Sequence, residues 1–321
     1  MRYSDDYLRE FIPREDPPEA LVPAVVREEI AGWIERDEIT DRRLVSRSTK
    51  WTYALINELR LFQFRILNPY GPILQLFHPN LPPPRFMIGL FDGVVERNGF
   101  GFIAHVPAGS DWHLHGEIAS WLEFPRLNAR FPLIIREVRY DEHGPDHPCN
   151  ATAASWARCN RTNRWGIITA GHAAPSSRLG CRVSLESGSY GVLVRSYHPP
   201  IDAAFIQTFP PKEHVSKLPI RRFPASGQPV IAELKTGQQS RIVVHVDSFM
   251  QVVNTRQYPV QLFLDQPFQH GDSGALIRTS MHEAVGLYLG SVTSPAVPTA
   301  SAGRVLNFEQ AALALKVTPY L

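Results

Sequence analysis

The chain has 321 residues, enough for one large domain and a smaller one, and 44% of them are hydrophobic, so a packed core can form. Its 33 lysine and arginine residues nearly balance 31 acidic residues, which argues against a dedicated nucleic-acid-binding protein. No apolar run reaches the roughly 18 residues of a membrane-spanning helix, and the charged N-terminus does not resemble a signal peptide. With three cysteines, an odd number, the sequence predicts a cytoplasmic protein without a disulfide framework and without membrane or nucleic-acid partners.

The first part of the chain has helical patterning. Apolar residues recur every three or four positions over 24–37 and again over 49–65, as expected of two amphipathic helices. The proline-rich stretch over 68–84 then excludes a long helix and is predicted to be a linker.

A β-hairpin is expected after this linker. Asn98-Gly99 joins two apolar runs within 85–106, which is a strong hairpin signal, and a short helix is predicted around 117–122. None of these segments carries residues typical of catalysis. We therefore interpret residues 1–131 as an α-rich, partly mixed region that regulates the rest of the chain or binds a partner.

From residue 132 onward, short β-rich segments follow one another, separated by Gly, Pro and Asn. This spacing is typical of an all-β barrel or sandwich. Two sets of six segments are present, as two small barrels would need, followed by an Ala- and Leu-rich closing helix over 308–317. The first set is 132–140, 151–157, 166–170, 181–185, 190–197 and 203–208. The second set is 217–223, 230–234, 240–253, 258–264, 275–278 with 284–289, and 304–307.

Three motifs in this region suggest nucleophilic catalysis by a serine. The run WGIITAGHA ends an apolar strand with His172, the run DAAFI begins another strand with Asp202, and QHGDSGAL places Ser273 between two glycines. A serine nucleophile needs a base to take up its proton, and the base needs an acid on its other ring nitrogen. His172, Asp202 and Ser273 offer these groups in that order.

The same motifs resemble those of the chymotrypsin-like (trypsin-like) serine peptidases. ITAGHA resembles the T-A-[AG]-H turn of that family, DAAF its D-[IL]-A strand, and GDSGAL its G-D-S-G-[GA]-[PL] nucleophile loop. The resemblance covers residues 132–321. It implies a mainly β domain of two six-stranded antiparallel barrels with a C-terminal helix, preceded by the α-rich region over 1–131.

The resemblance also implies an activity and a site. The protein would be a serine endopeptidase acting on protein or peptide substrates without a cofactor or metal. His172 would be the general base, Asp202 its orienting acid and Ser273 the nucleophile. The backbone N–H groups of Gly271 and Ser273 would form the oxyanion hole, with the site between the two barrels.

Two departures from the family concern cysteine usage and activation. Ala173 and Ala174 stand where a cysteine commonly follows the histidine turn, so Cys159 and Cys181 are expected to be free thiols. There is no R-[IV]-[IV]-G-G activation site, and so Asp272 needs another partner than a new N-terminal amine. We expect a nucleophile loop that folds constitutively, with regulation by residues 1–131.

A third departure concerns specificity. Pro267 stands six residues before the nucleophile, at the base of the primary pocket in this family, so a preference for Arg or Lys is not supported. Asp265 lies two positions earlier, and a loop shift could bring it in. The pocket residues implied by the resemblance are Pro267, Phe268, Tyr288, Leu289 and Gly290.

Two alternatives remain open at the level of sequence. One is a peptidase-fold protein that binds or acts as an adaptor without cutting. The other is a protein with a structural zinc site in the segment 113–159, where histidine, cysteine and acidic residues could supply nitrogen and sulfur ligands. The candidate ligands are His113, His115, Glu117, His143, His147, Cys149 and Cys159.

Overall fold

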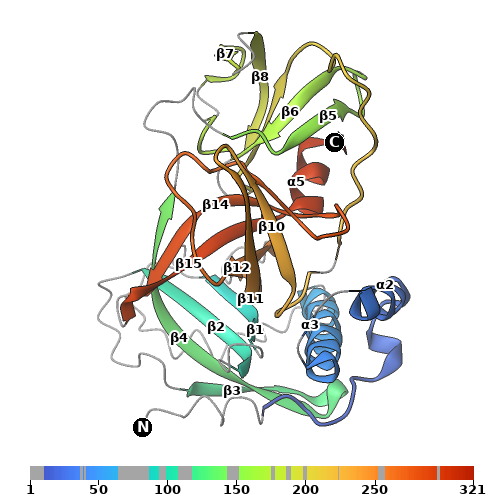
Figure 1. Cartoon of the computed structure of the whole chain (residues 1–321). Coiled ribbons are helices and arrows are strands. Elements are labelled where there is room, and N and C mark those ends of the chain that lie inside the picture. The colour runs from blue at the N-terminus through green and yellow to red at the C-terminus, as the bar shows by residue number, and fades with distance from the viewer. Residues whose placement is uncertain are drawn as a thin grey trace.

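The computed structural model describes residues 11–36, 39, 41–63, 87–93, 99–107, 118–142, 152–174, 178–185, 189–197, 201–222, 224–251, 257–294 and 297–321. These residues are mainly in β-strands (Figure 1). The helices are η1 (Glu19–Leu21), α2 (Ala24–Arg36), α3 (Arg42–Gln63), η3 (Pro125–Leu127) and α5 (Phe308–Leu315). The first nine strands are β1 (Met87–Gly93), β2 (Gly99–Pro107), β3 (Ile118–Phe124), β4 (Ala129–Glu142), β5 (Ser155–Cys159), β6 (Trp165–Thr169), β7 (Arg182–Ser184), β8 (Tyr190–Tyr197) and β9 (Ala203–Gln207). The other seven are β10 (Pro229–Leu234), β11 (Gly237–Gln251), β12 (Gln257–Leu264), β13 (Leu276–Arg278), β14 (Ala284–Ser294), β15 (Val297–Asn307) and β16 (Val317–Tyr320).

Six C-terminal strands form a closed barrel. They pair in the order β10-β13-β14-β15-β12-β11, and the pairing of β10 with β11 closes the ring. Alternate residues of β10 are buried, as the two-residue period of a strand requires. The buried side chains inside include Leu262, Val285 and Tyr288. One of the two predicted barrels is therefore present.

Four strands of the N-terminal part extend the sheet beyond the closed barrel. β11 pairs with β10 over residues 237–242 and then with β1 over 246–251. In the same way, β14 pairs with β13 near its start and with β4 over 290–293. The resulting sheet has ten strands, with β1, β2, β4 and β3 in that order beyond β11. Figure 1 shows these strands in teal and green, below the orange and red strands of the barrel.

The remaining six strands form a second sheet in the order β16-β5-β6-β9-β8-β7. Within the described residues no pairing joins β7 to β16, so these pairings leave a six-stranded sheet and the second predicted barrel is not confirmed. One face of this sheet, which includes Ile168 and Phe205, packs in the same core as Phe308 and Leu315 of α5. The opposite face carries a smaller cluster with Leu193 and Ile206.

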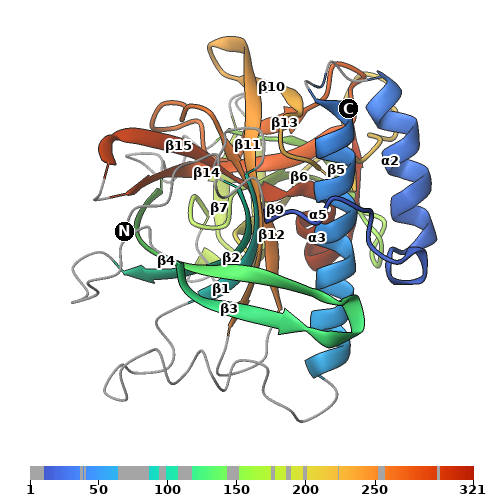
Figure 2. The same ribbon diagram turned by 90° about the horizontal axis from the view of Figure 1, so that it is seen from below.

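Helices α2 and α3 pack on each other and on the barrel. Val26 and Ile30 of α2 meet Val45 and Ala54 of α3, and Ala225 from the segment before β10 completes this cluster. Both predicted N-terminal helices are present, although α3 begins seven residues before its predicted start. Figure 2 shows the two helices together at one side of the molecule, with α3 beside β1. Because four strands accompany them, the N-terminal part is mixed, and an α-rich composition is not confirmed.

Several segment predictions are wrong. Residues 118–124 form strand β3, not a helix around 117–122, and the predicted strand 132–140 is the central part of β4 in the ten-stranded sheet. The segment 217–223 makes only isolated bridges at Lys217 and Ile220. Strand β16 was not predicted at all. The linker 68–84 lies outside the described residues. None of the helices in the described ranges is long and apolar enough to cross a membrane.

Candidate active site

The structure brings His172, Asp202 and Ser273 together in one hydrogen-bonded array. Nδ1 of His172 lies 2.8 Å from Oδ2 of Asp202, and Nε2 lies 3.0 Å from Oγ of Ser273. His172 follows β6, and Asp202 directly precedes β9, which pairs with β6. Ser273 comes from the other sheet, in the loop between β12 and β13. The array therefore joins the six-stranded sheet to the barrel.

The imidazole is held from both sides. Asp202 accepts a second hydrogen bond at Oδ1 from the backbone N–H of His172, at 2.8 Å, so the carboxylate fixes both the backbone and the ring of that residue. The side chains of His172 and Asp202 are 6% and 9% exposed, which shields their hydrogen bond from water. A carboxylate on Nδ1 favours the tautomer in which Nε2 is free to accept a proton.

Arg304 of β15 also faces the acid, a contact for which the sequence gives no motif. Its Nη2 lies 3.8 Å from Oδ2 of Asp202, and its side chain is 10% exposed. A buried cation at this distance stabilises the ionised carboxylate. The barrel thus contributes a positive charge to the acid on the neighbouring sheet.

Thr152 connects the nucleophile loop to the six-stranded sheet. Its backbone N–H donates to the carbonyl of Ser273 at 3.1 Å, and its hydroxyl donates to the carbonyl of Gly271 at 3.0 Å. Its own carbonyl accepts from the hydroxyl of Thr169, at the end of β6. Gly274 fits against this connection at φ +94°, and a Cβ there would collide with the carbonyl of Thr152 and the hydroxyl of Thr169. Glycine is therefore required beside Ser273.

The loop is also stabilised from within. Asp272 is buried, and its Oδ2 accepts the backbone N–H of Gln269 at 3.0 Å. The acid before the nucleophile thus has a partner in its own loop. Gly271 has φ +92°. In the described part of the chain, the N–H groups of Gly271 and Ser273 donate no hydrogen bond, so both donors are available to an incoming oxygen.

The hydroxyl of Ser273 has two acceptors within reach. It donates to the carbonyl of Leu289 at 2.9 Å, while Nε2 of His172 lies at 3.0 Å. A hydroxyl carries a single hydrogen, so it can donate to only one of them at a time. Ser273 is also 0% exposed. The structure therefore holds the serine in a buried state, in which the Leu289 carbonyl competes with the imidazole for its proton.

The five predicted pocket residues have different environments. Phe268 and Tyr288 belong to the barrel core, where their rings meet edge to face at 4.9 Å and the Tyr288 hydroxyl lies 2.9 Å from the Phe268 nitrogen, which donates to it. Burial raises the pKa of Tyr288 above its ordinary value, so this hydroxyl stays neutral. Leu289 is buried and reaches Ser273 through its carbonyl, and Gly290 has φ +148°. Pro267 is half-buried, with its Cα close to Gly303.

A large cavity lies against the six-stranded sheet and is bordered by Thr152, Thr169 and Ala173, which neighbour the triad residues. It has a volume of about 750 Å³ and includes Trp156, Ile167 and Ile206 of that sheet and Glu233 and Lys235 near the β10–β11 turn. None of the predicted pocket residues borders it.

Of the seven candidate zinc ligands, only Cys159 lies within the described ranges. The six outside them are His113, His115, Glu117, His143, His147 and Cys149. Among the described residues there is no group of three or more possible metal ligands. Cys159 is buried and Cys181 exposed, both as free thiols, as predicted. Burial opposes ionisation of Cys159, but hydrogen bonds involving Thr162, Arg161 and Arg195 lower its pKa to about 6.

No protein-family model matches the chain, and no curated protein matches it. Solved structures similar to it are chymotrypsin-like serine proteases. Protease A of Thermobifida fusca is 18% identical, with a TM-score of 0.39, over 53% of this chain and 90% of that chain. The chymotrypsin of Cellulomonas bogoriensis is 18% identical, with a TM-score of 0.38 and the same coverages. A glutamic acid-specific serine protease is 18% identical, with a TM-score of 0.39, over 56% of this chain and 99% of that chain.

Proposed function

We propose that the protein is a serine endopeptidase that cleaves peptide bonds in protein or peptide substrates through an acyl-enzyme. One observation carries this proposal: the continuous hydrogen-bonded array from Asp202 through His172 to Ser273. Both distances lie in the range that proton transfer requires, roughly 2.6–3.2 Å. Serine, base and acid come from separate loops in two sheets, and so their alignment does not follow from proximity in sequence.

The chemistry follows from the roles of these three groups. Ser273 Oγ attacks the substrate carbonyl carbon while Nε2 of His172 takes its proton, and Asp202 stabilises the imidazolium that forms. The N–H groups of Gly271 and Ser273 donate to the oxygen that becomes negative, a contribution typically worth about 10²–10³ in rate for each donor. His172 then protonates the leaving amine. In the second half, water attacks the ester with His172 again acting as base, and Ser273 is regenerated.

The substrate side chain before the scissile bond is proposed to lie near Pro267 and Gly290. Gly290 follows Leu289, whose carbonyl accepts the Ser273 hydroxyl, and Pro267 stands six residues before Ser273. Neither belongs to the barrel core cluster, whereas Phe268 and Tyr288 do. No acid stands at either position, so the proposal does not include a preference for basic side chains.

A second candidate function is that of a peptidase-fold protein that binds without cutting. The burial of Ser273 and its hydrogen bond to the Leu289 carbonyl favour this alternative, because both hold the hydroxyl away from a substrate. As an enzyme, the protein would need a rearrangement that uncovers Ser273.

A fluorophosphonate probe separates the two candidates. The wild-type protein is expected to be labelled at Ser273, and Ser273→Ala is expected to remain unlabelled. Ser184, an exposed serine on β7, provides the matched control: Ser184→Ala should be labelled like the wild type. Absence of labelling in the wild type, or equal labelling of Ser273→Ala, would support the binding protein.

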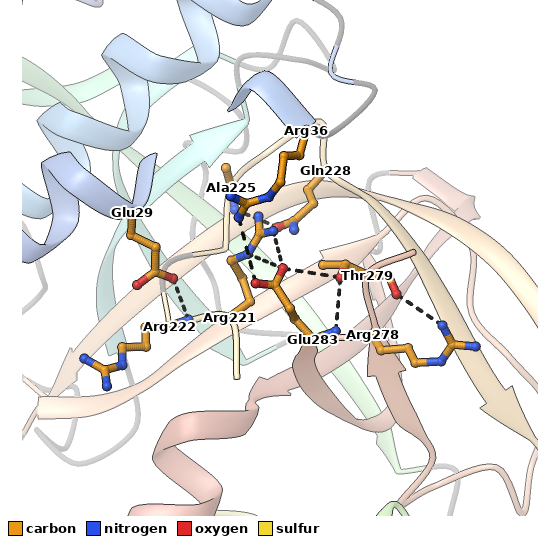
Figure 3. A network of polar contacts seen from close by, with 9 residues as sticks. All are labelled: Glu29, Arg36, Arg221, Arg222, Ala225, Gln228, Arg278, Thr279 and Glu283. Atoms are coloured by element: carbon orange, nitrogen blue, oxygen red, sulfur yellow. Dashed lines mark hydrogen bonds and ion pairs between the residues drawn. The ribbon is translucent and has the colours of Figure 1, made fainter. Parts of the chain in front are cut away.

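We also propose that residues 1–131 regulate the site, and a network of polar contacts supports this role (Figure 3). Glu29 of α2 accepts the backbone N–H of Arg222 at 3.0 Å, and Arg36 at the end of α2 lies 4.0 Å from Glu283. Glu283 also pairs at 2.5 Å with the fully buried Arg221. Because Glu283 lies in the turn joining β13 to β14, α2 contacts the turn between the strand that follows Ser273 and the strand whose Leu289 carbonyl accepts its hydroxyl.

A further inference from the structure

A strongly basic cavity lies between helices α2 and α3 and the segment before them. Its volume is about 690 Å³. The charged side chains that line it are Arg14, Asp16, Arg42, Arg43, Arg47 and Lys50. Five cations thus face a single carboxylate.

The charges of this basic cavity are mostly uncompensated. Lys50 pairs with Asp16 at 2.5 Å, which uses the only carboxylate in the lining. In the described part of the chain, none of the four guanidinium groups makes a hydrogen bond or an ion pair, and Arg14, Arg42 and Arg43 are exposed. Like-charged guanidinium groups on one surface repel one another, and an anion that binds among them relieves that repulsion.

An adjoining cavity of about 360 Å³ provides a comparison within the same fold. It shares Asp16 and Lys50 with the basic cavity, but its other cation, Arg27, is paired with Glu19. The cations of the adjoining cavity are therefore paired with carboxylates, whereas the four arginines of the basic cavity are not.

The start of helix α3 adds to the positive potential. Arg42 and Arg43 occupy its first turn, where the helix dipole already places partial positive charge. Asp41 before the helix uses its carboxylate to accept the N–H of Leu44, at 3.2 Å. Arg43, Arg47 and Lys50 follow at spacings of four and three residues, which places them along one face of the helix. The arrangement is unfavourable without a ligand and favourable with an anionic one.

We propose that this basic cavity binds a small polyanion that carries two or more phosphate groups. Guanidinium groups match phosphate oxygens with paired hydrogen bonds, and four of them surround a volume that is typical of small-molecule sites. A long nucleic-acid strand is disfavoured, because the whole chain has a net charge of only +2 and the excess of cations is confined to this cavity. The site is independent of the proposed peptidase activity.

Isothermal titration calorimetry of the full-length protein with inorganic tripolyphosphate, at constant ionic strength, tests the site. Saturable binding with one site per chain is expected. Arg43→Gln combined with Arg47→Gln should weaken binding about tenfold or more, since charge-assisted hydrogen bonds to phosphate are lost. Arg164→Gln, which removes an exposed arginine far along the chain in the turn before β6, should leave the affinity within about twofold of the wild type.

Further titrants identify the ligand class. ATP should bind with an affinity similar to that of tripolyphosphate, and inorganic phosphate more weakly, because fewer charges reach the arginines. Circular dichroism should give the same spectrum for the Arg43→Gln, Arg47→Gln protein and the wild type. No saturable binding, or equal binding by this double variant, would overturn the site. An affinity for single-stranded oligonucleotides that exceeds that for tripolyphosphate and rises with length would overturn the small-ligand assignment.

Discussion

Two bodies meet at the candidate site, the C-terminal barrel and the six-stranded sheet, and they differ in how many neighbouring elements support them. Ser273 belongs to a closed barrel whose strands β11 and β14 also pair with β1 and β4. His172 and Asp202 belong to a six-stranded sheet that the described pairings leave unclosed, packed against helix α5 and against barrel residues such as Leu276 and Leu287. The serine is thus fixed by an extended framework, whereas the base and the acid depend on a smaller one.

Residues of each body also contact the other body. Thr152, next to the six-stranded sheet, bonds the backbone of Ser273 and Gly271, and Arg304 of the barrel faces Asp202. The difference in support teaches that the alignment of the three side chains depends on these crossing contacts and on the hydrophobic core that the two sheets share, rather than on either sheet alone. The following changes test the two bodies and the contacts between them.

The largest expected effect comes from the acid of the smaller body. Asp202→Asn should lower kcat about 10⁴-fold, because an amide in this position favours the wrong tautomer of His172. Thermal unfolding should change little by comparison. Steady-state kinetics on a protein substrate measures the loss, with the exposed Glu213→Gln as control. An Asp202→Asn protein with nearly full turnover would mean that another group orients the imidazole.

A second change breaks the connection between the two bodies. Gly274→Ala should lower the free energy of unfolding by about 2–5 kcal/mol, because the methyl group collides with Thr152 and Thr169 at a φ that already strains alanine. Gly180→Ala is the matched control, with φ +82° but open space around it, and should cost only about 1–2 kcal/mol. Urea denaturation measures both. Equal losses in the two variants would show that the contact with Thr152 does not contribute.

A third change removes the charge that the barrel presents to Asp202. Arg304→Gln should lower kcat/KM about tenfold, because the ionised Asp202 carboxylate loses the cation that stabilises it. Arg304→Lys, which keeps the charge, should restore most of the activity. The exposed Arg182→Gln should leave kcat/KM unchanged. An equal loss in Arg304→Lys and Arg304→Gln would mean that Arg304 acts through packing and not through its charge.

The smallest expected effect concerns the support of the barrel by helix α2. Glu29→Ala removes the acceptor for the Arg222 N–H and should lower the free energy of unfolding by about 1 kcal/mol. Glu28→Ala, one residue earlier and exposed, should have almost no effect. Hydrogen exchange over 276–287 should speed up in the first variant only. Unchanged exchange in both would argue against coupling between α2 and the strands next to Ser273.

The candidate site could be predicted from the sequence because each of its parts is local. His172 and Asp202 stand next to apolar strands, and Ser273 lies between glycines that a tight loop requires. Arg304 could not be predicted, because an arginine on a strand carries no signal until the residue opposite is known. The hydrogen bond between Ser273 and the Leu289 carbonyl could not be predicted either. Every residue has a backbone carbonyl, and the residue type does not show which one the serine contacts.

The architecture was predictable only to the level of strand content. Most strands were found from their apolar runs, but their partners depend on contacts between distant residues, such as Leu90 with Ser248. Strand β16 was missed because it has only four residues and contains Pro319. The predicted boundary between 131 and 132 falls inside β4, since a change in composition need not coincide with a change in pairing.

Strands β11 and β14 each pair both within the barrel and with a strand of the N-terminal part, so the barrel cannot lose that part unchanged. Loss of the residues before 132 would remove β1, β2 and β3, and with β1 the partner of residues 246–251. Exposed backbone N–H and C=O groups along such a strand are templates for pairing with another chain, so the shortened protein should aggregate. The N-terminal strands are hydrogen-bonded to strands of the barrel, and proteolysis could not remove them without exposing strand edges of the barrel.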